Sequence, residues 1–132
     1  GFPLIAQSAI SGRNWSYPTL PVPEVPQGTL RSVSCSGLLC IAAGENDLLG
    51  GAPLIIRSDD GGFTWSYPVL PDSITSGYFN TANCSGQTCI AAGTVGPVNG
   101  EPFVAQSADG GMTWIYPTLP ENLGRFNGTN NT

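Results

Sequence analysis

Four cysteines have the spacing that most clearly predicts chemistry. Cys35 and Cys40 lie in CSGLLC, and Cys84 and Cys89 lie in CSGQTC, so each pair encloses a Ser-Gly turn. We expect each pair to face across a tight hairpin and to form the disulfides Cys35–Cys40 and Cys84–Cys89. A four-cysteine zinc site is the alternative, although zinc pairs usually have CxxC spacing. Disulfides would indicate an oxidising compartment, so we expect a secreted, cell-surface or periplasmic protein.

The residues available for catalysis are few. The chain contains no histidine, which excludes Ser-His-Asp and Cys-His arrangements and histidine-bearing metal sites. Paired carboxylates could hydrolyse a glycoside. The candidates, however, fall in or beside predicted loops, where solvated charge is the commoner role: Glu45, Asp47, Asp72, Glu101 and Glu121. Asp59-Asp60 could suggest calcium, but a related stretch has Ala108 in place of Asp59. We predict no catalytic residue, no metal and no cofactor.

Two further groups of residues could bind or carry sugars. Tyr17, Tyr67 and Tyr116 each follow a tryptophan by two residues, and exposed aromatic rings could stack on sugar rings. We favour the alternative, in which they pack against the proline-rich segments that follow them. Sequons for N-glycosylation occur at four asparagines, of which we expect the C-terminal pair to be the more exposed: Asn14, Asn83, Asn127 and Asn130.

The composition argues against some classes of partner and indicates the fold class. The net charge of −5 comes from 9 acidic residues against 4 arginines, without lysine, so we expect no nucleic-acid partner. No apolar run approaches about 20 residues, so we expect no membrane insertion. The 12 prolines interrupt nearly every window in which a helix could form, and the predicted class is all-β.

A repeat of about 49 residues organises the chain. Trp15, Trp65 and Trp114 lie 50 and 49 residues apart, in three related hairpins at 3–21, 53–71 and 102–120. Two copies of the cysteine hairpin lie between them, at 34–44 and 83–93. Each full unit therefore predicts four short antiparallel strands, the size and content of one propeller blade. A proline in the last strand cannot donate a ladder hydrogen bond, so that strand should lie at an edge or end there.

The hairpin turn carries a recognisable motif. Residues 58–65 (SDDGGFTW) and 107–114 (SADGGMTW) fit Ser-x-Asp-x-Gly-x-Thr-Trp, and SAISGRNW at 8–15 fits it partly. This pattern resembles the Asp-box, or BNR repeat, of sialidase-like β-propellers. The resemblance implies that the motif fastens the turn between the third and fourth strands, away from any catalytic face. The positions concerned are Ser58, Asp60, Gly62, Thr64 and Trp65, and Ser107, Asp109, Gly111, Thr113 and Trp114.

The resemblance does not extend to the catalytic residues of sialidases, which include a cluster of arginines. Only Arg13, Arg31, Arg57 and Arg125 are present, and Gln7 and Gln106 replace Arg57 in the other copies. No arginine recurs at a fixed position of the repeat, so we assign no catalytic role from the family.

The repeats predict one domain, residues 1–132, that depends on a partner. It would contain a half-blade at 3–21, blades at 31–70 and 79–120, and a tail or strand at 121–132, where Gly124-Arg125-Phe126-Asn127 is similar to Gly77-Tyr78-Phe79-Asn80. A closed propeller needs four to eight blades, so we expect neighbouring chains to complete the incomplete ones.

The expected function is non-enzymatic. We expect an extracellular structural or adhesive protein that assembles head to tail with itself, into an oligomer or a filament. The alternatives are a carbohydrate-binding propeller and a fragment of a sialidase-like glycoside hydrolase.

Overall fold

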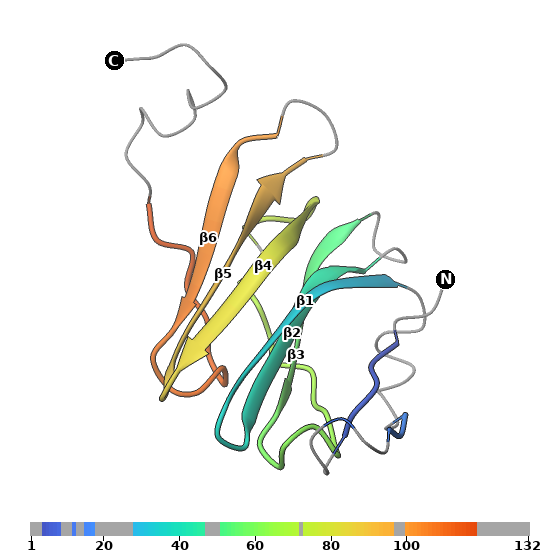
Figure 1. The fold of residues 1–132 in the computed structure, drawn as a ribbon. Helices are drawn as coiled ribbons and strands as arrows, with labels where there is room; N and C mark the ends of the chain where they lie inside the picture. Colours follow the sequence, from blue (N-terminus) through green and yellow to red (C-terminus); the bar gives the residue numbers. More distant parts are fainter. Residues whose placement is uncertain are drawn as a thin grey trace.

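Six β-strands form two sheets in the part of the chain that the structure describes. This computed structural model describes residues 4–8, 12, 15–17, 28–46, 51–71, 73–96 and 100–118. Two antiparallel three-stranded sheets have the orders β1-β2-β3 and β4-β5-β6 (Figure 1). The strands are β1 (Gly28–Ser36), β2 (Leu39–Asn46), β3 (Ala52–Ser58), β4 (Gly77–Ser85), β5 (Thr88–Val95) and β6 (Pro102–Ser107). The all-β prediction is confirmed. None of the described residues belongs to a helix that is long and apolar enough to span a bilayer.

The expected fourth strand of each sheet is reduced to one residue pair. Arg57 and Ser66 exchange two backbone hydrogen bonds beyond β3, and Gln106 and Ile115 do the same beyond β6. Continuing the register of the first pair places Pro68 at the next hydrogen-bonding position. Proline has no N–H, so the ladder ends there. The sheets therefore have three strands and a fourth segment held by a single pair.

The two sheets repeat the same hairpin. Cys35 lies opposite Cys40 and Cys84 lies opposite Cys89, and both disulfides are present. The cysteines face each other as predicted, but the turn residues are Gly37 and Leu38 in the first hairpin, one position later than the expected Ser-Gly. Each closed loop is short, so each bridge contributes about 2 kcal/mol in the chain-entropy model.

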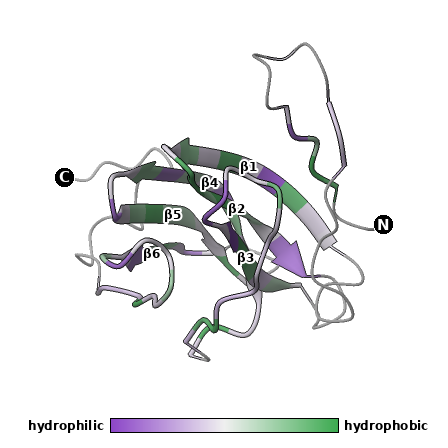
Figure 2. Cartoon of the chain, turned by 90° about the horizontal axis from the view of Figure 1, so that it is seen from below, coloured by the Kyte–Doolittle hydropathy of each residue, from purple (hydrophilic) through white to green (hydrophobic). Residues whose placement is uncertain are grey.

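The main core lies between the two sheets. The first sheet contributes Leu39, Ile41, Ala43 and Ile55, and the second sheet covers them with Phe79, Ala82, Ala91, Phe103, Ala105, Trp114 and the second disulfide. β1 and β4 lie side by side at one edge of this core (Figures 1 and 2). Along β1, apolar and polar residues alternate, as the bands of colour in Figure 2 show. Successive side chains point to opposite faces of a strand, so one set of β1 side chains points toward β4.

A smaller core covers the other face of the first sheet. Ala42, Leu54 and Ile56 are buried there, and Ile5 from the N-terminal segment packs against them. Gln7 pairs with Ser16 in the same manner as Arg57 with Ser66. The segment at 3–21, as far as it is described, therefore stacks on the first sheet as the first sheet stacks on the second.

Candidate functional site

The Gly-Gly turn after β3 is held by its own side chains. The buried Ser58 hydroxyl accepts hydrogen bonds from the backbone N–H groups of Asp60 and Gly62, and donates to the Asp60 carboxylate. That carboxylate also accepts from the hydroxyl and the N–H of Thr64. The Trp65 indole N–H donates to the carbonyl of Gly62 at 2.9 Å.

The turn after β6 has the same arrangement. Ser107, Asp109 and Thr113 repeat the hydroxyl and carboxylate bonds, and the Trp114 indole donates to Gly111 at 2.9 Å. Hydrogen bonds from Thr64 lower the pKa of Asp60 to about 2, and those from Thr113 lower the pKa of Asp109 to about 2. Each carboxylate accepts hydrogen bonds within its own turn, so the motif fixes the shape of the turn and does not present a reactive group.

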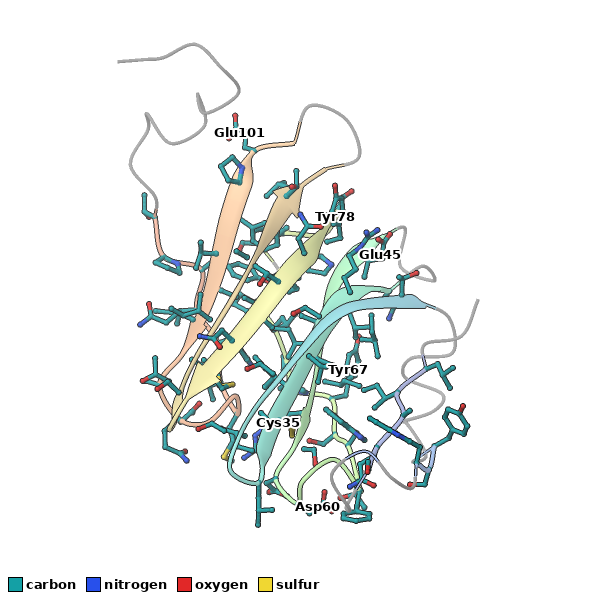
Figure 3. All side chains as sticks on the ribbon, in the orientation of Figure 1. Cys35, Glu45, Asp60, Tyr67, Tyr78 and Glu101 are labelled. Carbon is teal, nitrogen blue, oxygen red and sulfur yellow. A yellow bond between two sulfur atoms is a disulfide. The ribbon has the colours of Figure 1, made fainter. Side chains whose placement is uncertain are left out.

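The other charged candidates do not gather at one place. Glu45 pairs with Arg31 at 2.6 Å, and Arg31 also lies 4.6 Å from the ring centre of Tyr78. Glu101 directly precedes β6 of the other sheet, and Asp60 lies at the opposite end of the molecule (Figure 3). Asp59 pairs with Arg57 at 3.4 Å. No group of three or more histidine, cysteine, aspartate or glutamate side chains comes together within the described ranges.

Several predicted candidates lie outside the described residues. They are Arg13, Asn14, Asp47, Asp72, Glu121, Arg125, Asn127 and Asn130. Of the four sequons, Asn83 alone is described, as an exposed residue in the middle of β4.

The three tyrosines have three different environments. Tyr17 is 70% exposed. Tyr67 packs against the smaller core, and its hydroxyl accepts a hydrogen bond from Asn46 at 3.3 Å. Tyr116 packs edge-on against Phe103, with ring centres 5.6 Å apart. They therefore do not form a common exposed platform, and the contacts of Tyr67 and Tyr116 are with the two cores.

The most distinctive polar arrangement is a row of hydroxyls between the two sheets. Ser32, Ser34 and Ser36 all point from β1 toward β4 and accept hydrogen bonds from its edge. Their partners are the backbone N–H groups of Ala82 at 3.1 Å, Cys84 at 3.1 Å and Gly86 at 2.9 Å. In the β4–β5 register, the N–H groups of Ala82 and Cys84 point away from β5. The serine row therefore satisfies donors at a strand edge that would otherwise have no ladder partner.

A second contact joins the outer parts of neighbouring repeats. The Arg57 guanidinium donates to the carbonyl of Gly110, in the turn of the second sheet, at 2.6 Å. At the equivalent position of the N-terminal segment, the Gln7 amide donates to the carbonyl of Gly61 at 3.4 Å. The same position thus reaches the same turn of the next repeat in both cases.

The second sheet presents these contact positions again on its exposed side. Thr81, Asn83 and Ser85 occupy the places of Ser32, Ser34 and Ser36 in the 49-residue repeat, and all three are exposed. Ile90 corresponds to Ile41 and is 46% exposed, whereas Ile41 is fully buried. Gln106 corresponds to Arg57 and is exposed. We call these five residues (Thr81, Asn83, Ser85, Ile90 and Gln106) the open face.

Sequence reasoning did not predict this interface; it named Asn83 only as a sequon, and Arg57 and Gln106 only in the search for a catalytic arginine. A signal was present: RSVSCS and NTANCS both alternate small polar residues with apolar or cysteine residues. Alternation alone, however, does not indicate whether the polar set faces water or another strand.

Comparisons with known proteins support the fold. No family model matches the chain. No curated protein matches it either. A solved structure described as YCF48 bound to D1 peptide is 21% identical, with a TM-score of 0.58 over 80% of this chain and 30% of that one. A protein of unknown function from Dyadobacter fermentans is 20% identical, with a TM-score of 0.52 over 87% of this chain and 37% of that one. The chain spans about a third of the length of each, and the likeness shows a propeller-like fold.

Proposed function

We propose that this chain is a non-enzymatic, structural propeller-type protein of the extracellular space that assembles head to tail with copies of itself. The open face of the second sheet is the contact surface in this proposal. The two disulfides support an oxidising environment. The two complete Ser-x-Asp-x-Gly-x-Thr-Trp turns, similar to the Asp-box of sialidase-like propellers, support a stack of repeated blades.

The observation that carries the proposal is the serine row between β1 and β4. This row is part of the contact between the two sheets within the chain. In that contact, serine hydroxyls of β1 accept hydrogen bonds from backbone N–H groups of β4, Ile41 is buried, and Arg57 donates to the carbonyl of Gly110. Thr81 and Ser85 offer hydroxyl acceptors of the same kind, and Asn83 offers an amide whose oxygen also accepts a hydrogen bond from Ser34 within the chain at 3.4 Å. Ile90 and Gln106 offer the other two contacts. A surface with these five groups fits the edge and turn of a sheet of the same repeat.

The composition of the open face favours a second copy as the partner. The chain carries a net charge of −5, so most of its surface would repel another copy. None of the five open-face residues is charged. Copies can therefore meet there without placing like charges together. Because the contact joins two different surfaces, it extends into a ring or a filament rather than a closed symmetric dimer.

The alternative functions have less support. A carbohydrate-binding role through the tyrosines would use Tyr17, since Tyr67 and Tyr116 are packed against cores. A hydrolase would need paired carboxylates, and Glu45, Glu101 and Asp60 lie apart (Figure 3).

Self-association can be measured by sedimentation velocity over a range of concentrations. We expect the mean mass to rise with concentration, and the Ile90→Arg variant to shift association to at least tenfold higher concentration, because it places a cation in an apolar contact. Leu38→Arg is the matched control, since Leu38 is 67% exposed in the β1–β2 turn and lies outside the open face. A wild-type protein that stays monomeric, or equal effects of the two variants, would contradict the proposal.

A further inference from the structure

The N-terminal segment repeats the turn geometry of the two sheets. The Trp15 indole N–H donates to the carbonyl of Gly12 at 2.8 Å. Trp65 and Trp114 make the same bond in their own turns, each at 2.9 Å. The segment lies on the side of the first sheet away from the second sheet (Figure 1). Trp15 is therefore held by the same bond as its two equivalents, and its surroundings can be compared with theirs.

Three large residues of this segment are exposed although their equivalents are covered. Leu4 is 69% exposed and Trp15 is 61% exposed, and Tyr17 is exposed as well. The equivalents lie in the two cores or pack against them: Leu54, Trp65 and Tyr67 from the hairpin at 53–71, and Phe103, Trp114 and Tyr116 from the hairpin at 102–120. We call Leu4, Trp15 and Tyr17 the N-terminal face.

The turn glycines show which side chains cover a turn of this repeat. A Cβ atom on Gly111 would lie 3.3 Å from Ile41 and 3.5 Å from Arg57, both in the first sheet. A Cβ atom on Gly62 would lie 3.1 Å from Gln7, in the N-terminal segment. Each of these turns is thus covered by side chains from the repeat that precedes it in the chain.

The turn of the N-terminal segment has no such cover among the described residues. A Cβ atom on Gly12 would have Trp15 of its own turn within 4 Å, and no other described residue. Ile90 and Gln106 of the open face occupy the repeat positions of the two residues that cover the Gly111 turn. Both are exposed. The second sheet therefore presents the side chains that would cover a turn, and the N-terminal segment presents an uncovered turn.

We infer that the N-terminal face of one copy binds the Ile90 and Gln106 part of the open face of another copy. This inference rests on the proposed head-to-tail assembly and identifies the second of its two surfaces. In this contact Ile90 lies over Trp15, and the Gln106 side chain reaches the turn that contains Gly12. Removal of these apolar side chains from water favours the association.

The charges are compatible with this pair of surfaces. Residues 1–21 contain one arginine and no acidic residue, whereas all 9 acidic residues lie further along the chain. No residue of the N-terminal face or of the open face is charged. The N-terminal segment is therefore attracted to an acidic second copy, where other parts of the surface would be repelled.

Variants that block one surface test this inference by sedimentation velocity. Leu4→Arg blocks the N-terminal face and Ile90→Arg blocks the open face. Leu38→Arg is the matched control, because Leu38 is 67% exposed and lies outside both faces, and all of these variants change the net charge equally. We expect Leu4→Arg, and independently Tyr17→Arg, to shift association to at least about tenfold higher concentration, because each places a cation in an apolar contact.

A mixture of two blocked variants identifies the contact itself. At a concentration where the wild type assembles and each variant alone is monomeric, equal amounts of Leu4→Arg and Ile90→Arg should form a complex of two copies and nothing larger. The reason is that the intact open face of the first variant binds the intact N-terminal face of the second, and neither retains another surface for growth.

The outcomes separate this inference from the proposed function. Weakened association of Ile90→Arg, with wild-type association of Leu4→Arg and Tyr17→Arg, would overturn the inference alone. A mixture without the two-copy complex, or with larger assemblies, would do the same. A wild-type protein that stays monomeric would overturn both. Circular dichroism of each variant verifies that it is folded.

Discussion

At the residue scale, the two aspartates of the turns are carboxylates whose charged form is favoured by hydrogen bonds in the folded chain. Asp60 accepts hydrogen bonds from Ser58, Phe63 and Thr64, all within the turn that precedes the last segment of the blade. Hydrogen bonds to the charged form of a carboxylate favour that form, which is why the pKa falls. The side chain thus organises a turn that two consecutive glycines would otherwise leave flexible.

This gives a pH prediction. The pKa of Asp60 and of Asp109 falls from 3.8 to about 2 on folding, so each ionised group stabilises the fold above pH 4. The free energy of unfolding should therefore decrease as the pH falls from about 4 to about 2. Urea titrations at several pH values measure it. The Asp60→Asn/Asp109→Asn variant should show a shallower decrease in this range, and an unchanged slope would contradict the assignment.

At the element scale, a β-bulge and a glycine set the path of the first strand in each sheet. The register of β4 against β5 shifts between Phe79 and Thr81, and Gly93 lies opposite. A Cβ atom on Gly93 would lie 1.8 Å from the carbonyl oxygen of Tyr78. The first sheet repeats this with Gly44. The glycine allows the backbones to approach closely at the bulge.

Gly93→Ala should therefore separate β4 from β5. Backbone atoms surround the site and cannot move aside as a flexible side chain would, so we expect a loss of about 3 kcal/mol in the free energy of unfolding. Thr88→Ala, at an exposed position of the same strand, is the control and should change stability by less than about 0.5 kcal/mol. Equal stability of the two variants in urea titrations would show that the close contact between the backbones of β4 and β5 at Gly93 is not required.

At the scale of the whole molecule, the serine row couples the two sheets. Its three hydroxyls join β1 to a strand edge 50 residues further along the chain. The large apolar core lies directly behind this row. The contact between hydroxyls and edge amides thus stabilises the folded chain, and in our proposal a contact of the same kind joins two copies.

Two triple variants separate these roles. Ser32→Ala/Ser34→Ala/Ser36→Ala leaves the β4 amides without acceptors, and we expect a loss of about 2 to 3 kcal/mol in the free energy of unfolding. Thr81→Ala/Asn83→Ala/Ser85→Ala should retain stability within about 1 kcal/mol but weaken self-association. Urea titration and sedimentation velocity measure the two effects. Similar effects of both variants on stability would contradict the division.

Much of the fold could be predicted from local sequence. The spacing of Trp65 and Trp114, the turn glycines and the cysteine pairs predicted the all-β class, the repeat and both disulfides. Each turn and each cysteine pair involves residues that are close together in the chain, so these features can be recognised from the sequence alone. The proline was expected to end the fourth strand or to place it at an edge, and the ladder does end after one residue pair, because Pro68 has no N–H for the next hydrogen bond.

The tertiary structure decided which surfaces are covered. Ile41 and Ile90 occupy the same position of the repeat, yet one is fully buried and the other is 46% exposed. Within the described residues, another sheet stacks on that side of the first sheet and none stacks on that side of the second. Leu4 and Leu54 are likewise equivalent in sequence, and one is exposed whereas the other is fully buried. The amino-acid order alone determined the repeating unit, since its strands and turns are specified locally. Stacking decided the open face and the N-terminal face, because both depend on contacts between residues far apart in the chain.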